Sequence, residues 1–251
     1  MEIGLMHRDA QHRARQFAEL LHRRQQIRLG RELALAADAQ RLVDPGHEED
    51  QLHEAAAFDD AIVRARKIRV LIFDVDGVLT DGQIFVAPGP DGHGIETKGF
   101  AAHDGLGISL ARLGGLRVGI ITKRNSQTVA IRARDLKLEF VYQGQAHKMH
   151  AINEILAKAE INLDQLAYVG DDIIDLPVMK VCGLAIATAN ARPQIKNISH
   201  FITTNPGGFG AGRDAIDFIL EAQGTLERTI SDYLDEENAA AAAADVGQGG
   251  M

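Results

Sequence analysis

From Lys67 onward, short apolar runs typical of β-strands alternate with segments of helical periodicity. The strand-like runs are IRVLIFD, LRVGIIT, LEFVYQ, LAYVGDD, CGLAIAT and HFITT, and helical periodicity occurs near residues 105–113, 126–136, 147–159 and 211–222. Strands joined through helices pair in parallel, because each helix returns the chain along one face of the sheet. The sequence therefore predicts an α/β fold: a doubly wound, Rossmann-like parallel sheet formed by residues 67–224.

One segment of this region departs from the alternation. In GQIFVAPGPDGHGIETKGF, two β-compatible pieces flank APGPDGHG, a turn rich in proline and glycine. Such a turn between two strand-like pieces is typical of a hairpin. We therefore expect residues 82–99 to form a β-hairpin that projects from the sheet.

The two ends of the chain differ in composition from the sheet-forming region. Residues 1–66 contain many arginines but neither lysine nor serine, and much of this segment has helical character. Three interpretations stay open for it: a helical extension that packs or oligomerises, a solvated and partly disordered arm, and an artefactual upstream start. Residues 225–251 form a tail in which a short charged helix precedes the alanine- and glycine-rich end NAAAAAADVGQGG.

Charge and composition narrow the classes of partner. With 27 basic against 35 acidic residues, the formal net charge is -8, so no overall positive field attracts nucleic acid or an anionic membrane. The single cysteine, Cys182, excludes an intramolecular disulfide and a cysteine-based zinc site, and it fits a reducing compartment. No run approaches the roughly 18 apolar residues of a membrane span, and the amino terminus lacks the apolar core of a signal peptide. We expect a cytoplasmic protein.

The run LIFDVDGVLTDG, residues 71–82, ends an apolar strand in three aspartates within eight residues. Burying unpaired carboxylates costs several kcal/mol per ion, so like charges this close together require a cation or a proton. Hard oxygen ligands suit Mg²⁺, which usually takes one or two protein carboxylates, water and the substrate's own phosphate. The run therefore indicates a magnesium site.

Further polar residues follow other strand-like runs. Asp74 and Asp76 follow VLIF, Thr122 follows VGII, and Asp171 and Asp172 follow AYVG. In an open α/β sheet the carboxyl ends of the strands form the crevice where ligands bind, so these groups are expected to converge. Lys148 begins the helix after VYQGQ, where its charge adds to the positive end of the helix dipole and favours an anion. The pattern predicts a carboxylate cluster beside a phosphate-binding corner, which suits phosphate-ester hydrolysis with a carboxylate nucleophile and a second carboxyl as acid.

The segments DVDGVLTDG, IITKRNS, GQAHK and VGDDIIDLPVM, in this order, resemble the four motifs of the haloacid dehalogenase superfamily of phosphatases. The stretch 68–224, with KGFAAHDGLG and GGFGAGRDAIDFILEAQG, more closely resembles the capless family of KDO 8-phosphate phosphatases. That family hydrolyses 3-deoxy-D-manno-octulosonate 8-phosphate (KDO 8-phosphate) on the route to lipopolysaccharide. The resemblance implies a Mg²⁺-dependent phosphatase that acts on this sugar phosphate.

The resemblance also implies roles for single residues. Asp74 is the expected nucleophile that forms an aspartyl phosphate, and Asp76 is the expected general acid and base. Asp74, Asp76 through its backbone carbonyl, and Asp171 would ligate Mg²⁺. Thr122 and Lys148 would hold the transferring phosphoryl group.

Five more side chains follow from the same resemblance. Asp172 and Asp175 match orienting carboxylates around the metal. Arg124, in ITKRNS, and Arg213, in GAGRD, are candidates to bind the carboxylate of the sugar, and His103, in AAHDG, is a candidate substrate contact. Lys123 stands where the family usually has glycine, which leaves open whether its charge touches substrate or faces solvent.

The resemblance further implies a homotetramer in which the hairpin, residues 82–99, reaches a neighbouring subunit. Three other functions stay open at this stage: a phosphatase for a sialic-acid-type nonulosonate 9-phosphate, a non-catalytic oligomerisation module of the same fold, and a signalling receiver domain. Receivers place an acidic pair on the first strand and the phosphoacceptor on a later one, whereas here DVD comes first and GDD last. The complete set of motif residues argues against the non-catalytic module.

Overall fold

The computed structural model describes residues 56–89 and 94–235. Its main element is a sheet of six strands in the order β5-β4-β1-β6-β7-β8, and every neighbouring pair is parallel. The strands are β1 (Val70–Phe73), β4 (Arg117–Ile121), β5 (Phe140–Tyr142), β6 (Leu166–Gly170), β7 (Leu184–Ala187) and β8 (Phe201–Ile202). The predicted doubly wound parallel sheet is confirmed, and each strand lies inside one of the six runs identified in the sequence.

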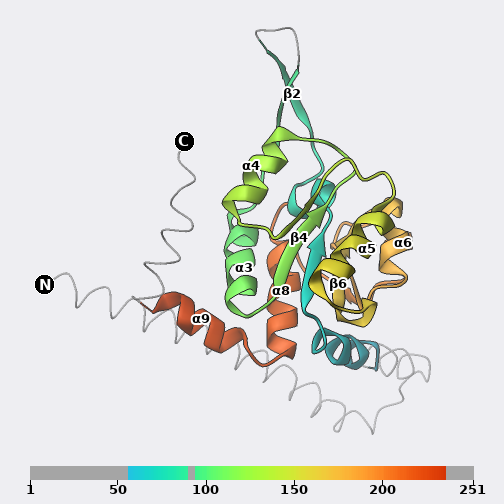
Figure 1. Ribbon diagram of the computed structural model, residues 1–251, viewed down its shortest axis with the longest axis vertical. Helices are drawn as coiled ribbons and strands as arrows, with labels where there is room; N and C mark the ends of the chain where they lie inside the picture. The colour runs from blue at the N-terminus through green and yellow to red at the C-terminus, as the bar shows by residue number, and fades with distance from the viewer. Residues whose placement is uncertain (1–55, 90–93, 236–251) are drawn as a thin grey trace, which may run out of the picture. The chain divides into compact units, whose positions relative to one another are not determined.

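Helices cover both faces of the sheet, which explains why the strands are apolar at consecutive positions. Val70 and Ile72 of β1 pack in one core cluster, while Leu71 and Phe73 pack in the other. The first of these faces is covered by α5 (Lys148–Ala159) and α6 (Leu176–Met179), and the second by α3 (Ala102–Leu113), α4 (Gln127–Asp135) and α8 (Ala211–Ala222) (Figure 1). The central strand is therefore fully enclosed, which fixes the position of the residues that follow it.

Shorter elements complete the described chain. They are η2 (Val75–Leu79), η3 (Leu163–Gln165), η4 (Ile173–Asp175), α7 (Pro193–Lys196) and α9 (Leu226–Leu234). The short helix expected in the tail is α9, whose Leu226, Ile230 and Tyr233 pack against the core cluster of α3 and α8.

The segment assigned to an amino-terminal extension, residues 1–66, is described only from residue 56. Residues 56–65 are helical, and Ala61 and Ala65 are buried in the core cluster that contains Leu71. Arg64 Nη1 also donates a hydrogen bond of 3.1 Å to the carbonyl oxygen of Gly183. The three interpretations of the extension concern residues that lie mainly outside the described ones, as does the alanine-rich end of the tail.

The predicted hairpin is present between β1 and α3. It consists of β2 (Phe85–Pro88) and β3 (Gly94–Thr97), which pair in antiparallel register with Phe85 opposite Thr97, and it extends beyond the carboxyl ends of the sheet strands (Figure 1). Its residues 90–93 lie outside the described part. Phe85, Val86 and Ile95 are more than half exposed, so the hairpin presents apolar side chains to its surroundings.

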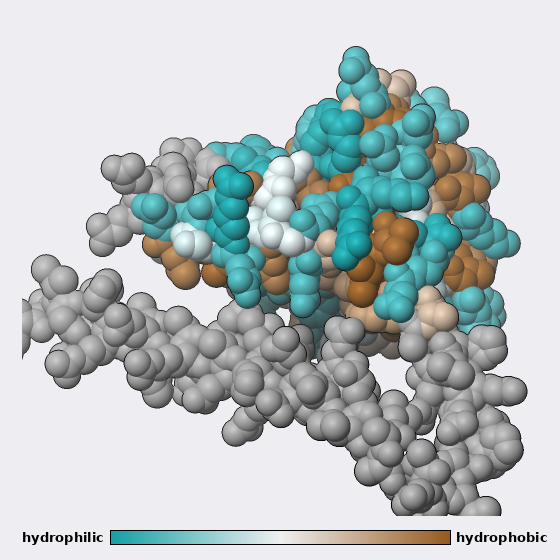
Figure 2. Space-filling view, turned by 90° about the horizontal axis from the view of Figure 1, so that it is seen from below, coloured by the Kyte–Doolittle hydropathy of each residue, from teal (hydrophilic) through white to brown (hydrophobic). Residues whose placement is uncertain are grey.

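Among the described residues, no helix has the length and apolar character needed to cross a membrane. The face seen from below in Figure 2 shows hydrophobic residues in several separate patches between hydrophilic ones.

Candidate active site

The candidate site lies where the strand order of the sheet reverses. β1 pairs with β4 on one side and with β6 on the other, and the chain winds away from β1 in both directions. Such a switch point opens a crevice at the carboxyl ends of the strands. Asp74 directly follows β1, and its backbone N–H donates to the carbonyl oxygen of Val169 at 3.0 Å, while Asp171 directly follows β6. The topology therefore brings together two aspartates that are 97 positions apart in the sequence.

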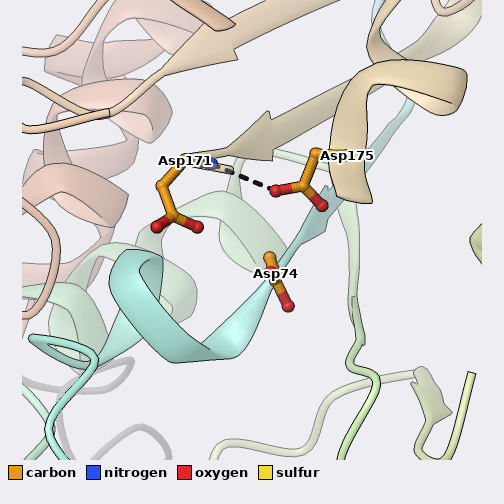
Figure 3. Close-up of side chains that lie close together, drawn as sticks. All are labelled: Asp74, Asp171 and Asp175. Carbon is orange, nitrogen blue, oxygen red and sulfur yellow. Dashed lines mark hydrogen bonds between the residues drawn. The ribbon is translucent and has the colours of Figure 1, made fainter. Parts of the chain in front are cut away.

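Asp74, Asp171 and Asp175 form what we term the carboxylate cluster. One carboxylate oxygen of each lies within 4.8 Å of the others, and Figure 3 shows the three side chains around the end of β1. Asp175 is fixed by the backbone, because its Oδ2 accepts a hydrogen bond of 3.1 Å from the N–H of Asp171. The cluster thus joins the loop after β1 to η4.

Lys148 provides the positive charge that faces this cluster. Its Nζ lies 2.9 Å from Asp74 Oδ2 and 2.7 Å from Asp175 Oδ1, and it donates to the Tyr168 hydroxyl at 2.9 Å. The Tyr168 hydroxyl in turn donates to Asp175 Oδ1 at 2.8 Å. Lys148 is the first residue of α5, as the sequence predicts, and all four side chains are buried. Tyr168 was not singled out from the sequence, although alternation along β6 places it on the face of α5.

The charges of the cluster are incompletely balanced. Burial and the neighbouring Asp175 carboxylate raise the pKa of Asp74 to about 7, although Lys148 opposes the shift. Burial, followed by Asp74 and Asp175, raises the pKa of Asp171 to about 8. Asp171 Oδ1 is buried and has no hydrogen-bond partner among the described residues. When all three carboxylates are ionised, the single lysine leaves two negative charges, and this oxygen-donor set fits a divalent cation such as Mg²⁺.

The loop after Asp74 depends on Gly77. This residue has a φ of +91°, and a Cβ atom there would lie 2.1 Å from Asp171 Oδ2. Both the left-handed backbone and the close approach of Asp171 exclude a side chain. Asp74 itself is oriented at this turn, because its Oδ1 accepts a hydrogen bond of 2.7 Å from the N–H of Val75.

Asp76 has a different environment from Asp74. Its side chain is 23% exposed, and its Oδ1 accepts a hydrogen bond from Nζ of Lys98, just after β3. Lys98 was not identified from the sequence as a site residue. The only signal was its place at the end of the hairpin in KGFAAHDGLG, and that place does not reveal which group it contacts.

The structure places the remaining predicted residues as follows. Thr122 is buried at the end of β4, next to β1, where its N–H donates to the carbonyl oxygen of Tyr142. Asp172 is exposed and lies outside the carboxylate cluster, since its Oδ1 accepts from the N–H of Ile173 and so caps η4. His103 and Lys123 are exposed.

The two candidate arginines lie in different places. Arg124 lies at the base of the hairpin, with its Nη2 3.1 Å from Glu96 Oε2. Arg213 is on α8, where its Nε donates to Asp217 Oδ1 at 2.7 Å. The described contacts therefore tie the Arg213 guanidinium to its own helix rather than to the cluster.

Asp104, the neighbour of His103, has a structural contact. It is buried on α3, and its Oδ1 accepts a hydrogen bond of 2.8 Å from the N–H of Arg213, so it caps the start of α8. Burial raises the pKa of Asp104 to about 6.

Comparisons with known proteins agree with this geometry. The family model described as haloacid dehalogenase-like hydrolase matches residues 120–207. The 3-deoxy-D-manno-octulosonate 8-phosphate phosphatase KdsC of Yersinia pestis is 43% identical over 169 residues, which cover 67% of this chain and 88% of that protein. KdsC of Escherichia coli K12 is 42% identical over 168 residues, or 67% and 87% of the two chains.

Two solved structures extend the comparison to the fold. The crystal structure of the Yersinia pestis phosphatase has a TM-score of 0.64 at 44% identity and covers 67% of this chain and 89% of its own. The Moraxella catarrhalis phosphatase, crystallised with a magnesium ion, a phosphate ion and KDO, has a TM-score of 0.65 at 36% identity and covers 70% and 98%.

A parallel sheet with an aspartate pair after its central strand and a second acidic pair after the neighbouring strand defines a haloacid dehalogenase-like hydrolase. Within this class, the chain belongs to the family of 3-deoxy-D-manno-octulosonate 8-phosphate phosphatases. The resemblance seen in the sequence is confirmed.

Proposed function

We propose that this protein hydrolyses KDO 8-phosphate to KDO and inorganic phosphate, with Mg²⁺ as its cofactor, in the synthesis of lipopolysaccharide precursors. The observation that carries the proposal is the carboxylate cluster at the switch point, with Lys148 buried against it. This combination offers oxygen ligands to a cation and a positive group to a phosphate at one site. Phosphate monoesters are among the slowest esters to hydrolyse unaided, and such dense electrostatic stabilisation is what their cleavage requires.

Asp74 is the proposed nucleophile. Its Oδ1 accepts from the N–H of Val75 and its Oδ2 faces Lys148, so the carboxylate is held in one orientation at the end of β1. Attack of one of its oxygens on phosphorus forms an aspartyl phosphate and breaks the bond to the sugar oxygen. Water then attacks the phosphorus, releases phosphate and regenerates the carboxylate.

Asp76 is the proposed general acid and base. It lies two residues beyond the nucleophile and is partly exposed, as a group that exchanges protons with substrate and water must be. In the first step it donates a proton to the leaving sugar oxygen, and in the second it accepts one from the attacking water.

Asp74, Asp171 and the backbone carbonyl of Asp76 would hold the metal ion. When bound, Mg²⁺ supplies positive charge that lets the Asp74 carboxylate approach a phosphate dianion. Asp175 orients this set through Lys148 and the N–H of Asp171. Asp172 acts farther out, through the cap of η4.

The phosphoryl group is proposed to bind between Thr122 and Lys148. Thr122 offers a hydroxyl at the end of β4, and Lys148 offers a charge at the positive end of α5. Of the substrate candidates, Arg124 suits the carboxylate of the sugar best, because its side chain is 48% exposed beside the hairpin. His103 is exposed and stays a candidate substrate contact. Arg213 is hydrogen-bonded to Asp217, which argues for a structural role of this arginine.

The hairpin supports a proposed homotetramer. Its apolar side chains Phe85, Val86 and Ile95 are more than half exposed, and an exposed apolar hairpin is a surface that a neighbouring subunit can cover. A tetramer in which hairpins contact neighbouring subunits buries these side chains. Multi-angle light scattering is expected to give four times the chain mass, and a monomer at micromolar concentration contradicts the assembly. The proposed pathway places the enzyme in the cytoplasm, where soluble sugar phosphates are made.

The test of the substrate is phosphate release measured with Mg²⁺ and with EDTA. KDO 8-phosphate is compared with a nonulosonate 9-phosphate and several hexose phosphates. The proposal expects metal-dependent turnover with the highest kcat/KM on KDO 8-phosphate. Preference for the nonulosonate ester keeps the chemistry and replaces the substrate. A folded, magnesium-loaded protein inactive on every ester favours the non-catalytic oligomerisation module.

A further inference from the structure

Lys98 is a buried lysine at the base of the hairpin, immediately after β3. None of its side-chain surface is exposed, and its Nζ is hydrogen-bonded to Asp76 Oδ1 and lies 3.7 Å from Glu96 Oε1. Burying a charged ammonium group destabilises the folded protein unless carboxylates lie close to it. Asp76 and Glu96 supply these carboxylates to Lys98. Among the described residues, Lys98 is the hydrogen-bond partner of the Asp76 carboxylate, and its ion pairs are with Asp76 and Glu96 rather than with the carboxylate cluster.

The strand that carries Lys98 is itself fastened to the start of α4. Glu96 accepts hydrogen bonds from Ser126 Oγ at Oε1 and from Arg124 Nη2 at Oε2, the latter at 3.1 Å. The Thr128 hydroxyl donates to the backbone carbonyl of Glu96 at 2.9 Å. These contacts fix β3 against the loop that follows β4, although the rest of the hairpin projects away from the sheet (Figure 1). The position of Lys98 is therefore set by the domain core.

Asp76 needs such an anchor because its own loop provides little. The backbone departs from helical geometry at Asp76 and Gly77, within η2, and the side chain is partly exposed. A general acid contributes only when its carboxyl lies within hydrogen-bond distance of the leaving oxygen, and losing that geometry forfeits much of its effect. Lys98 holds Oδ1, which leaves Oδ2 available to face the substrate.

We propose that Lys98 is a positioning residue for Asp76: it holds the acid so that its second oxygen reaches the oxygen of the departing sugar. The inference rests on the proposed function, because it takes Asp76 as the acid of a phosphate-ester hydrolysis. It assigns to the hairpin a part in the chemistry of its own subunit, in addition to any contact with a neighbour.

The test uses two esters that differ in their need for an acid. The alkyl oxygen of KDO 8-phosphate requires protonation as it leaves, whereas p-nitrophenyl phosphate releases a stabilised phenolate that does not. The measured quantity is kcat/KM, which covers the steps up to departure of the leaving group and is independent of the later hydrolysis of the aspartyl phosphate. The variants are Lys98→Met, Lys98→Gln and Lys98→Arg. Lys180→Met serves as a matched control, because Lys180 is exposed at the end of α6.

We expect Lys98→Met to lower kcat/KM on the sugar phosphate by about ten- to a hundredfold, a fraction of the full effect of a general acid. On p-nitrophenyl phosphate the change is expected to stay within about threefold, and Lys98→Arg is expected to recover most of the lost activity. Lys98→Gln, which keeps a donor of similar length, is measured in the same way if the methionine variant does not fold. The control variant is expected to match the wild type on both esters.

Two results overturn the inference. An equal fall on both esters assigns Lys98 to phosphate binding or to folding, and unchanged kcat/KM on both esters removes it from the reaction. A wild-type protein that cleaves a different alkyl phosphate, but not KDO 8-phosphate, contradicts only the proposed substrate. The comparison of the Lys98 variants is then made on that ester against p-nitrophenyl phosphate.

Discussion

The two aspartates of the DVD motif are held by two regions with opposite electrostatics. In the carboxylate cluster, one lysine contacts the buried Asp74 and Asp175 beside the half-buried Asp171, and the pKa values of Asp74 and Asp171 are raised. The second region is the hairpin base, defined as Glu96, Thr97 and Lys98. Here Lys98 contacts Asp76, and Glu96 accepts hydrogen bonds from Arg124 and Ser126. The hydrogen bond from Ser126, followed by the hydrogen bond from Arg124 and the charge of Lys98, lowers the pKa of Glu96.

This difference shows which region is incomplete without a ligand. Raised pKa values mean that the cluster resists carrying its full negative charge, and an added divalent cation relieves that resistance. The lowered pKa at the hairpin base means that its charges are already matched by the protein. Before a ligand binds, Lys98 therefore already holds Asp76, whereas Asp74 lies among negative charges that the protein alone does not neutralise.

The largest effect on activity is expected from Lys148→Met, which removes the lysine charge that faces the carboxylate cluster. Asp74 and Asp175 then lose the charge that both contact, and the phosphoryl group loses a partner. We expect kcat to fall by about a thousandfold, the upper range for the loss of one stabilising donor. Lys158→Met on the same helix is the control, because Lys158 is exposed and pairs with Glu154 at the surface. A Lys148→Met enzyme that retains more than a tenth of wild-type kcat in steady-state kinetics contradicts the role of this lysine.

A smaller effect is expected at the hairpin base from Glu96→Gln. The substitution keeps the shape of the side chain but removes the charge that faces Arg124 and Lys98. Because Arg124 and Lys98 then lose an anchor without leaving the site, kcat/KM is expected to fall by about three- to tenfold. A loss of kcat/KM as large as that of Lys148→Met in the same assay contradicts the proposed difference between the two regions.

The smallest effect is a difference in thermal stability that follows from the raised pKa values. Between about pH 4 and pH 8, folded metal-free protein holds protons on Asp74 and Asp171 that the unfolded chain has released. This contribution to stability therefore falls as the pH rises through that window. Mg²⁺ is expected to raise Tm by about 5 °C at pH 8 and by less at pH 6, because the ligands are deprotonated more readily at the higher pH.

Differential scanning fluorimetry with and without Mg²⁺ at the two pH values measures this effect. Asp171→Asn serves as the comparison protein, since it removes one charge of the cluster and is expected to lose most of the gain at pH 8. An equal rise in Tm with Mg²⁺ at both pH values, or a full rise in Asp171→Asn, contradicts binding of the metal at the carboxylate cluster.

The two regions also differ in how far the sequence predicts them. The position of Asp74 follows from strand periodicity and from the rule that parallel strands end at one edge, and Lys148 follows from the start of a helix. The contact between Lys98 and Asp76 depends on how a projecting hairpin folds back against α4, which no local pattern encodes. Arg213 is a different case, because its partner Asp217 is four residues away on the same helix, a spacing at which oppositely charged side chains commonly pair. A basic residue in a family segment does not reveal which acid it contacts.

The central claim is that Asp74 attacks phosphorus and carries the phosphoryl group. The most direct test mixes the magnesium-loaded enzyme with KDO 8-phosphate labelled in its phosphate, quenches the reaction in acid within milliseconds and maps label bound to protein. The expected result is transient label on the peptide that contains Asp74 in the wild type, and neither label nor turnover in Asp74→Asn. Turnover by the wild type without label on that peptide, or sustained turnover by Asp74→Asn, contradicts it.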